Sequence, residues 1–275
     1  MISGHTRIAA VIGAPIAHSL SPVILNAAFA ATGLDWAFLA FEVADGDAAP
    51  ALDGMRALGI RGLSVTMPHK EAVAGLVDRC SADAAALGAV NCVVRDGDDL
   101  VGESTDGAGF IDAIAAETGF AFKGRRVVVL GAGGAARAVV LSAARAGAAD
   151  IAVVNRTEAK AARAAALAGA VGRVASFDDV PAADLVVNAT PIGMLDDGLP
   201  CDAGLLHAGQ VVADLIYHPA ATPLLAAARE RGATAVNGLA MLVHQAGHSF
   251  KRWTGVDPPL AAMESGARAA LTETR

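Results

Sequence analysis

The chain has 275 residues, of which 54% are hydrophobic, 18% charged and 4% aromatic, and its formal net charge is −7. An acidic chain lacks the basic face that nucleic-acid-binding proteins usually carry, so we expect no nucleic-acid partner. The mean hydropathy is +0.48, yet charges, prolines or turn residues interrupt every apolar stretch before it reaches about 18 residues. This pattern predicts no membrane-spanning helix, no signal peptide and no anchor.

The cysteine content indicates a reducing compartment. Cys80, Cys92 and Cys201 are scattered and form no CxxC motif. An odd, sparse set of cysteines does not suit a disulfide framework. We therefore expect a cytoplasmic protein, and the length suits two domains of ordinary size.

The first hundred residues combine strand–helix units with a hairpin. An apolar strand is expected at 7–13, followed by a helix in 19–33 with Ser21 as its N-cap, Pro22 at its first position and Gly33 at its end. Strands at 36–43 and 62–68 alternate with helices at 47–58 and near 69–77. Within 89–105, the pair Asp96-Gly97 separates two apolar runs and indicates a hairpin. The first sheet is therefore predicted to be mixed.

The second half alternates strands and helices more regularly. Strands are expected in 125–130, 150–155, 183–193, 209–219 and 233–238, with helices in the segments between them. Continuous apolar strands of this kind predict a parallel, doubly wound, Rossmann-like sheet covered on both faces. The break between the two domains falls just after Asp106, and two helices, in 239–255 and 258–273, follow the second sheet.

A glycine-rich turn connects the first strand of the second half to its helix. The sequence "VVVLGAGGAARA" places Gly131, Gly133 and Gly134 between the two elements. Glycines permit a tight turn and a close approach of phosphate, while the start of the helix offers unpaired N–H groups. With a second strand following about 20 residues later, the turn predicts dinucleotide binding.

The end of that second strand indicates the type of dinucleotide. An NAD site usually has an acidic residue there, whereas this chain has Asn155, Arg156 and Thr157, with Lys160 one turn into the helix. Cations can pair with a 2′-phosphate that an acid would repel. The sequence therefore predicts NADP as the cofactor.

Polar side chains gather at strand ends in the first domain. They are the hydroxyl, amide and charged residues Ser19, Ser21, Ser64, Thr66, Lys70, Asn91 and Asp106. Neutral donors and acceptors with one cation and one anion suit a small polyhydroxylated ligand, although each residue alone could be a helix cap or a turn residue. His244 and His248 stand at i, i+4, but the sequence shows no third ligand, so no metal site is expected.

Taken in order, the motifs resemble the shikimate dehydrogenase family over essentially the whole length. They are "GAPIAHSLSP" (13–22), "VTMPHK" (65–70), "GAVN" (88–91), "TDG" (105–107), "GAGGAARA" (131–138), "NRT" (155–157), "NATPIGM" (188–194), "DLIYHP" (214–219) and "NGLAMLVHQAGHSFKRWTG" (237–255). The family usually has asparagine at the positions of Ser64 and Ser104 and histidine at Leu25, so this chain departs from the pattern there.

The resemblance implies a domain organisation and a site. A substrate domain would comprise 1–106 and 239–275, an NADP-binding Rossmann domain would comprise 107–238, and the active site would lie in a cleft between them. Substrate-binding residues would be Ser19, Ser21, Ser64, Thr66, Asn91, Tyr217 and Gln245. Cofactor-binding residues would be Gly131, Ala132, Gly133, Gly134, Ala135, Asn155, Arg156, Thr157, Lys160, Thr190 and Gly238.

The chemistry implied is reversible NADP-dependent reduction of 3-dehydroshikimate to shikimate, in the biosynthesis of chorismate and the aromatic amino acids. Lys70 would donate the proton to the developing alkoxide and Asp106 would orient it, while Ser19 and Ser21 would bind the substrate carboxylate. Quinate or an aminated analogue is the alternative substrate. A non-catalytic, dinucleotide-responsive regulator is the alternative from another class, but it should lack the Lys70–Asp106 pair. The sequence leaves open whether the protein is a monomer or a homodimer.

Overall fold

The computed structural model describes residues 2–273. Internal contacts divide the chain into two compact units: unit 1 contains Met1–Thr105 and Val243–Arg275, and unit 2 contains Asp106–Leu242. Each unit has a six-stranded sheet of its own. Within the described residues, no helix is both long enough and apolar enough to span a membrane.

Unit 1 is built on a mixed sheet, as the sequence predicted. Its strands follow the order β2-β1-β3-β5-β6-β4 and comprise β1 (Arg7–Gly13), β2 (Trp36–Glu42), β3 (Gly62–Val65), β4 (Arg79–Cys80), β5 (Cys92–Asp96) and β6 (Asp99–Glu103). Strands β2 and β3 pair with β1 in parallel, whereas β5 pairs with β3 and β6 in antiparallel fashion. The predicted hairpin joins β5 to β6, and Gly97 in its turn has a φ of 63°.

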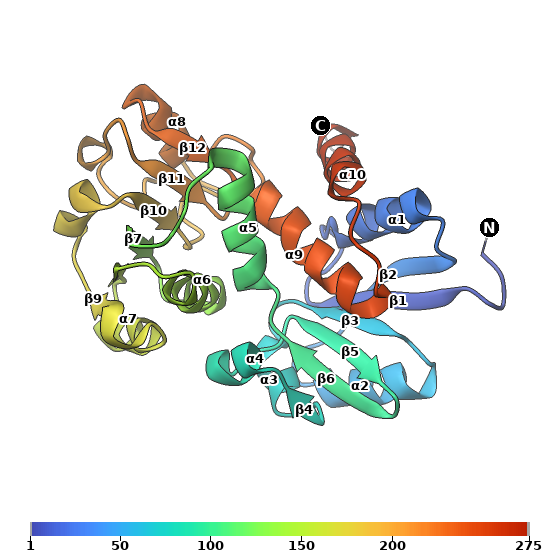
Figure 1. Cartoon of the computed structure of the whole chain (residues 1–275). Helices are drawn as coiled ribbons and strands as arrows, with labels where there is room; N and C mark the ends of the chain where they lie inside the picture. The colour runs from blue at the N-terminus through green and yellow to red at the C-terminus, as the bar shows by residue number, and fades with distance from the viewer. Residues whose placement is uncertain (1, 274–275) are drawn as a thin grey trace. The chain divides into compact units, whose positions relative to one another are not determined.

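Helices cover both faces of this sheet. One face packs on α2 (Ala48–Ala57), α3 (Lys70–Ala74) and α4 (Ala82–Leu87). On the other face lie α1 (Ser21–Thr32), the part of α9 (Gly238–Thr254) that belongs to unit 1, and α10 (Leu260–Glu273), with α1 and α10 side by side (Figure 1). Trp253 anchors α9, because its indole Nε1 donates to the Val93 carbonyl at 3.1 Å and its ring stacks on Phe38.

The start of α1 differs from the prediction by one residue. The helix begins at Ser21 with Leu20 as its N-cap, so Ser21 is not the cap and Pro22 takes the second helical position. The N-cap residue Leu20 makes no side-chain hydrogen bond to the helix, and Pro22 fits the first turn because its missing N–H would have no helical partner there. Predicted boundaries commonly shift by one or two residues because helix ends satisfy few hydrogen bonds.

Unit 2 is built on a fully parallel sheet. Its strands follow the order β12-β11-β10-β7-β8-β9 and comprise β7 (Arg126–Leu130), β8 (Asp150–Val154), β9 (Gly172–Val174), β10 (Leu185–Asn188), β11 (Val211–Asp214) and β12 (Thr234–Val236). Numbered from β7, this is the order 3-2-1-4-5-6 of the Rossmann fold. The predicted fold class, a mixed α/β unit together with a Rossmann-like unit, is confirmed.

Alternate residues of these strands enter two separate cores. On β7, Val127 and Val129 pack against α5 (Asp106–Thr118), α6 (Gly134–Arg145) and α7 (Glu158–Ala166). Val128 and Leu130 face the 3₁₀-helix η2 (Phe177–Ala182) and α8 (Pro223–Glu230). Strands with both faces buried read as continuous apolar runs, which is why the sequence revealed them so clearly.

Short elements escaped the sequence-based prediction. They are β4, α4, β9 and the 3₁₀-helices η1 (Gly169–Val171), η2 and η3 (Ala203–Leu205). Segments of two to six residues contain too few positions to display a hydrophobic period.

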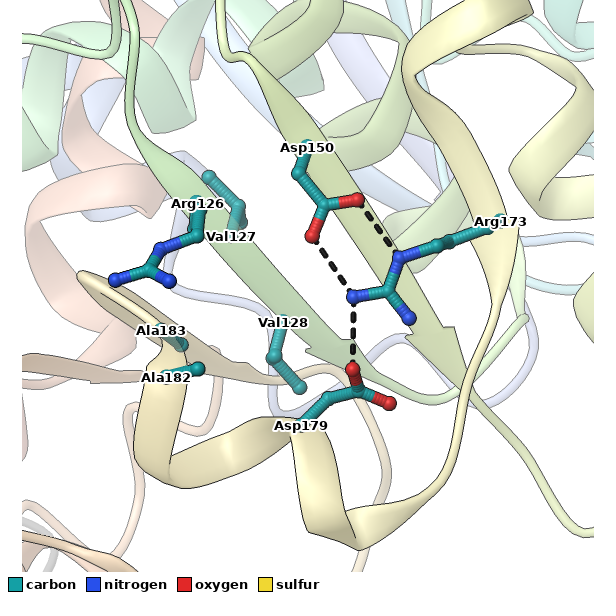
Figure 2. Close-up of a pocket in the computed structure, with 8 residues that line it drawn as sticks. All are labelled: Arg126, Val127, Val128, Asp150, Arg173, Asp179, Ala182 and Ala183. Carbon is teal, nitrogen blue, oxygen red and sulfur yellow. Dashed lines mark hydrogen bonds and ion pairs between the residues drawn. The ribbon is translucent and has the colours of Figure 1, made fainter.

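Charged side chains form a cluster at the end of the unit 2 sheet where β7 and β8 begin. Arg173 on β9 donates from Nε and Nη2 to the two carboxylate oxygens of Asp150, each at 2.8 Å, and from Nη2 to Asp179 at 2.7 Å (Figure 2). Asp150, Arg173 and Asp179 line a small pocket of about 140 Å³ together with Arg126. The hydrogen bond from Arg173 lowers the pKa of Asp179, so the contacts join β8, β9 and η2.

This cluster predicts a pH-dependent contribution to stability. Since the folded-state pKa of Asp179 lies below its unfolded value, the contribution is fully present above that unfolded value and declines as pH falls through the folded one. Asp179→Asn should lower the free energy of unfolding by about 1 kcal/mol at pH 7, measured by urea denaturation. The deficit should shrink below about pH 4.

Asp178→Asn is the matched control, since Asp178 accepts from the Ser176 hydroxyl on the same turn. This control variant should keep a free energy of unfolding near that of the wild type at every pH tested. A deficit of Asp179→Asn that does not change with pH would contradict the assigned charge interaction.

Candidate active site

The glycine turn of unit 2 has the geometry of a phosphate-binding turn. Gly131 adopts a φ of 113°, and a Cβ there would lie 2.9 Å from the Ala189 carbonyl oxygen, so a side chain is excluded. Gly133 is the N-cap of α6, and a Cβ on Gly133 or Gly134 would meet no atom within 4 Å. The start of this 12-residue helix is therefore open at both glycines, and the N–H groups of a first helical turn, which lack helical partners, suit a phosphate group.

The neighbouring strand end presents the predicted cations. Arg156, Thr157 and Lys160 are exposed between β8 and the first turns of α7. The Asn155 amide donates to the Thr157 carbonyl at 2.9 Å and thereby shapes the turn. The Gly131 N–H donates to the Val154 carbonyl at 2.8 Å, so this turn begins beside the glycine turn. Exposed cations at this position fit a phosphorylated ribose.

A buried polar network continues the same edge of the sheet. Asn188 ends β10, and its Oδ1 accepts from the Thr190 hydroxyl at 2.7 Å and from the Thr190 N–H at 3.0 Å. Its Nδ2 donates to Asp214 Oδ1 at 3.0 Å. Asp214 ends β11 and also accepts from the Thr222 hydroxyl at 2.7 Å. The network fixes the orientation of Thr190, one of the predicted cofactor-binding residues.

In unit 1, the pairing of β3 with β5 brings predicted substrate-binding residues together. The Val65 N–H donates to the Asn91 carbonyl at 2.8 Å, and the Val90 N–H donates to the Lys70 carbonyl at 2.9 Å. Thr66 follows the last residue of β3 and donates from its N–H to the Ile12 carbonyl. The segments that carry Thr66, Lys70 and Asn91 are thus adjacent.

His69 anchors the start of the helix that carries Lys70. Its side chain is 1% exposed, and its Nε2 contacts the Val43 carbonyl oxygen at 2.8 Å. Its N–H donates to the Thr66 carbonyl at 3.0 Å, which closes the turn between β3 and α3. We assign His69 a structural role, since its ring is committed to the backbone of another segment.

A second buried network surrounds the Asn91 side chain. Its Nδ2 donates to Thr105 Oγ1 at 2.9 Å, and its Oδ1 accepts from the Thr105 N–H at 2.7 Å. Gln245 Oε1 lies 3.4 Å from the same Nδ2, and Ser249 Oγ lies 3.3 Å from Thr105 Oγ1. Both Asn91 and Thr105 are buried, so these bonds replace the water that the polar groups lose.

The remaining predicted substrate residues occupy defined positions. Ser19 accepts from the Ser21 N–H at 3.3 Å at the start of α1, and Ser64 lies on β3 in register with Cys92. Tyr217 and Asp106 belong to unit 2, Tyr217 three residues after β11 and Asp106 at the first position of α5. Burial raises the pKa of Tyr217, so its hydroxyl stays protonated at neutral pH.

The structure also shows residues that the sequence analysis missed. They are the buried polar partners Thr105, Asn188, Asp214, Thr222 and Ser249. A signal was available for two of them, since Asn188 and Asp214 end apolar parallel strands at the edge that carries the glycine turn. Ser249 stands four residues after Gln245 and so shares its helix face. Within residues 2–273, no group of three or more His, Cys, Asp or Glu could hold a metal ion.

A parallel sheet in Rossmann order with this glycine turn defines unit 2 as a dinucleotide-binding unit. Comparison with known proteins agrees. Residues 11–93 match the family model of the shikimate dehydrogenase substrate binding domain. Residues 113–192 match that of shikimate/quinate 5-dehydrogenase, and residues 238–265 match that of the shikimate 5′-dehydrogenase C-terminal domain.

Individual relatives match over nearly the whole chain. Shikimate dehydrogenase (NADP(+)) of Geobacter metallireducens is 45% identical, covering 98% of this chain and 99% of its own. The structure of Thermus thermophilus shikimate 5-dehydrogenase in complex with NADP(H) and shikimate has a TM-score of 0.90 at 36% identity, covering 96% and 100%. Quinate dehydrogenase of Corynebacterium glutamicum in complex with NAD also has a TM-score of 0.90, at 31% identity, covering 96% and 99%. The chain belongs to the shikimate dehydrogenase family.

The Asn91 network generates a prediction about stability. Thr105→Val keeps the side-chain shape but removes the oxygen that accepts from Asn91, so the free energy of unfolding should fall by about 1–3 kcal/mol. Urea denaturation measures the change. Thr32→Val is the matched control, because the Thr32 hydroxyl donates locally within α1, to the Ala28 and Phe29 carbonyls. This substitution should lower the free energy of unfolding clearly less. Equal losses would mean that the Asn91 network adds nothing beyond a local bond.

Proposed function

We propose that this chain catalyses the reversible, NADP-dependent reduction of 3-dehydroshikimate to shikimate. The observation that carries the proposal is the set of backbone hydrogen bonds, Val65 to Asn91 and Val90 to Lys70, that gathers the segments of Thr66, Lys70 and Asn91 in one part of unit 1. A cation beside hydroxyl and amide groups suits a hydroxylated ring whose carbonyl oxygen gains negative charge during reduction. The relatives named above are enzymes of this substrate class.

In the proposed reaction Lys70 is the proton donor. NADPH, when bound, supplies the hydride for the ring carbonyl carbon. The Lys70 ammonium gives its proton to the carbonyl oxygen as charge develops there, so no free alkoxide has to form. Asp106 accepts a hydrogen bond from the resulting hydroxyl and helps to orient the ammonium. In the reverse direction, Lys70 accepts the proton from the shikimate hydroxyl.

The other residues bind and orient the substrate. Ser19 and Ser21, which lie at the start of α1, hold the carboxylate through their hydroxyls. Thr66, Asn91 and Gln245 bond to the ring hydroxyls, with Ser64 and Tyr217 nearby in the proposed site. The Asn91 network holds its amide with a fixed choice of donor and acceptor atoms.

The cofactor is held by unit 2. The diphosphate sits on the turn formed by Gly131, Ala132, Gly133, Gly134 and Ala135. Asn155, Arg156, Thr157 and Lys160 bind the 2′-phosphorylated ribose, and Thr190 and Gly238 complete the site. The N–H groups of α6 and the exposed cations of β8–α7 support this assignment. The unpaired cysteines agree with a reducing, cytoplasmic location.

A rate assay with two substrates and two cofactors tests the proposal. Purified protein should reduce NADP⁺ with shikimate, with a higher kcat/KM than for NAD⁺ because Arg156 and Lys160 meet the 2′-phosphate. Quinate is the alternative substrate, favoured by the serine at position 64, where the family usually has asparagine. Faster turnover of quinate would replace shikimate in the proposal, and no turnover with either would reject the enzyme function.

The role of Lys70 predicts a large kinetic effect. Lys70→Ala should lower kcat by about 10²-fold or more, while the Kd of NADP⁺ stays near the wild-type value because the cofactor is held by unit 2. Lys251→Ala is the matched control, since Lys251 pairs with Asp257 on the surface of the same unit. Near-wild-type turnover of Lys70→Ala would remove this residue from the mechanism.

A further inference from the structure

Among the residues that the structure describes, no cation pairs with the buried carboxylate of Asp214. Asp214 is 1% exposed, and burial raises its pKa. Three donors in the described part of the chain reach it, and all are neutral: Asn188 Nδ2 at 3.0 Å, the Ile216 N–H at 3.1 Å and the Thr222 hydroxyl at 2.7 Å. Such a group is costly to bury, so its position calls for an explanation.

Each of the three donors belongs to a segment that leaves the carboxyl edge of the unit 2 sheet. Asn188 ends β10 and holds Thr190 through two hydrogen bonds. Ile216 lies in the turn after β11, and its carbonyl accepts from the Gly238 N–H at 3.0 Å. Thr222 is the N-cap of α8. Asp214 therefore connects the segments that carry Thr190 and Gly238.

An open groove of about 650 Å³ lies over this network. Its lining residues come from two segments, 193–197 and 218–226, and include Gly193 and Thr222. Asn188 Nδ2 also donates to the Ile192 carbonyl at 3.3 Å, directly before Gly193. Asn188 and Asp214 thus tie both lining segments to the sheet.

Gly238 shows how closely these segments are fitted. A Cβ at Gly238 would collide with the Leu215 carbonyl oxygen and lie 2.5 Å from the Leu215 carbonyl carbon. A shift of the turn after β11 would therefore displace the start of α9. The hydrogen bond from Ile216 to Asp214 opposes such a shift, because a buried bond cannot be exchanged for one to water.

We propose that Asp214 is a positioning residue for the cofactor site, and that it acts through Asn188 on Thr190 and through the turn at Ile216 on Gly238. The inference rests on the proposed function, in which Thr190 and Gly238 bind NADP. It assigns Asp214 no contact with the cofactor and no part in proton transfer. The role depends on the arrangement of its hydrogen bonds to Asn188, Ile216 and Thr222 and not on its negative charge.

The Kd of NADP⁺, measured by calorimetry without substrate, tests the proposal. Asp214→Leu removes all three acceptor contacts and should raise the Kd at least about tenfold, because misplaced binding groups lose most of their contribution. Asp214→Asn should stay within about threefold of the wild type. Its amide oxygen can accept from Asn188 and Ile216, and its NH₂ group can donate to the Thr222 oxygen.

Val212→Ala is the matched control for lost stability. Val212 is fully buried two residues earlier on β11 and belongs to no polar network. It should lower Tm while leaving the Kd of NADP⁺ unchanged. If Asp214→Leu does not fold, Thr222→Val replaces it, and a Kd raised about threefold or more is then expected.

Two results would overturn the proposal. Wild-type affinity in Asp214→Leu, or in Thr222→Val if that variant replaces it, would show that the network only stabilises the fold. Affinity as weak in Asp214→Asn as in Asp214→Leu would show that the charge is what matters. A wild-type protein that binds no NADP⁺ would instead reject the proposed function, and the positioning role with it.

Discussion

The reciprocal pair of hydrogen bonds between Asn91 and Thr105 is the interaction on which unit 1 depends. It joins the residue before β5 to the second residue after β6, so both ends of the hairpin are fixed at one point. The Val90 N–H, directly before Asn91, donates to the Lys70 carbonyl and holds that segment beside this point, while Gln245 and Ser249 attach α9 to it. If either hydrogen bond were displaced, the segments of the hairpin region that carry proposed substrate residues would therefore move as well.

Unit 2 also fixes its strand ends through buried polar side chains, but the chemical groups differ. Its strand ends are joined by the amide of Asn188 and the carboxylate of Asp214, both buried, instead of by an amide and a hydroxyl. In the described part of the chain, no buried side-chain nitrogen or oxygen lacks a hydrogen-bond partner. Hydrophobic burial holds each sheet to its helices but has no direction, whereas hydrogen bonds fix which atoms face the ligand. The apolar composition of this chain makes the few buried polar groups decisive for geometry.

The sequence predicted those parts of the structure that show a hydrophobic period or a recognisable motif. Strands β7, β8, β10 and β11 are continuous apolar runs, and the turn at Gly131 follows directly from its glycines. The sequence did not reveal the partners of Asn91, because the contact with Thr105 spans a hairpin and the contact with Gln245 spans 154 residues. Ser249 joins the network through Thr105, 144 residues away. It misplaced the cap of α1, since Ser21 and Pro22 also fit a helix that begins one residue later. Asp214 ends an apolar strand, which marks the edge of the sheet, but its burial depends on Asn188 and Thr222, whose contacts with it the sequence does not show.

Ser64 is the proposed substrate residue at which this chain departs from the usual asparagine of its family. Its register partner Cys92 is fully buried, and burial raises the pKa of the Cys92 thiol to about 12, so this neighbour stays neutral and inert at physiological pH. Cross-strand partners in an antiparallel pair point to the same face of the sheet, so Ser64 lies beside a packed thiol and carries only a short hydroxyl. A longer amide at this position would reach further from the strand and would itself fill part of the space. Under the proposed function, the serine therefore shifts the recognition of the ring from position 64 to Thr66 and Asn91, whose places are set by backbone hydrogen bonds rather than by the length of a side chain.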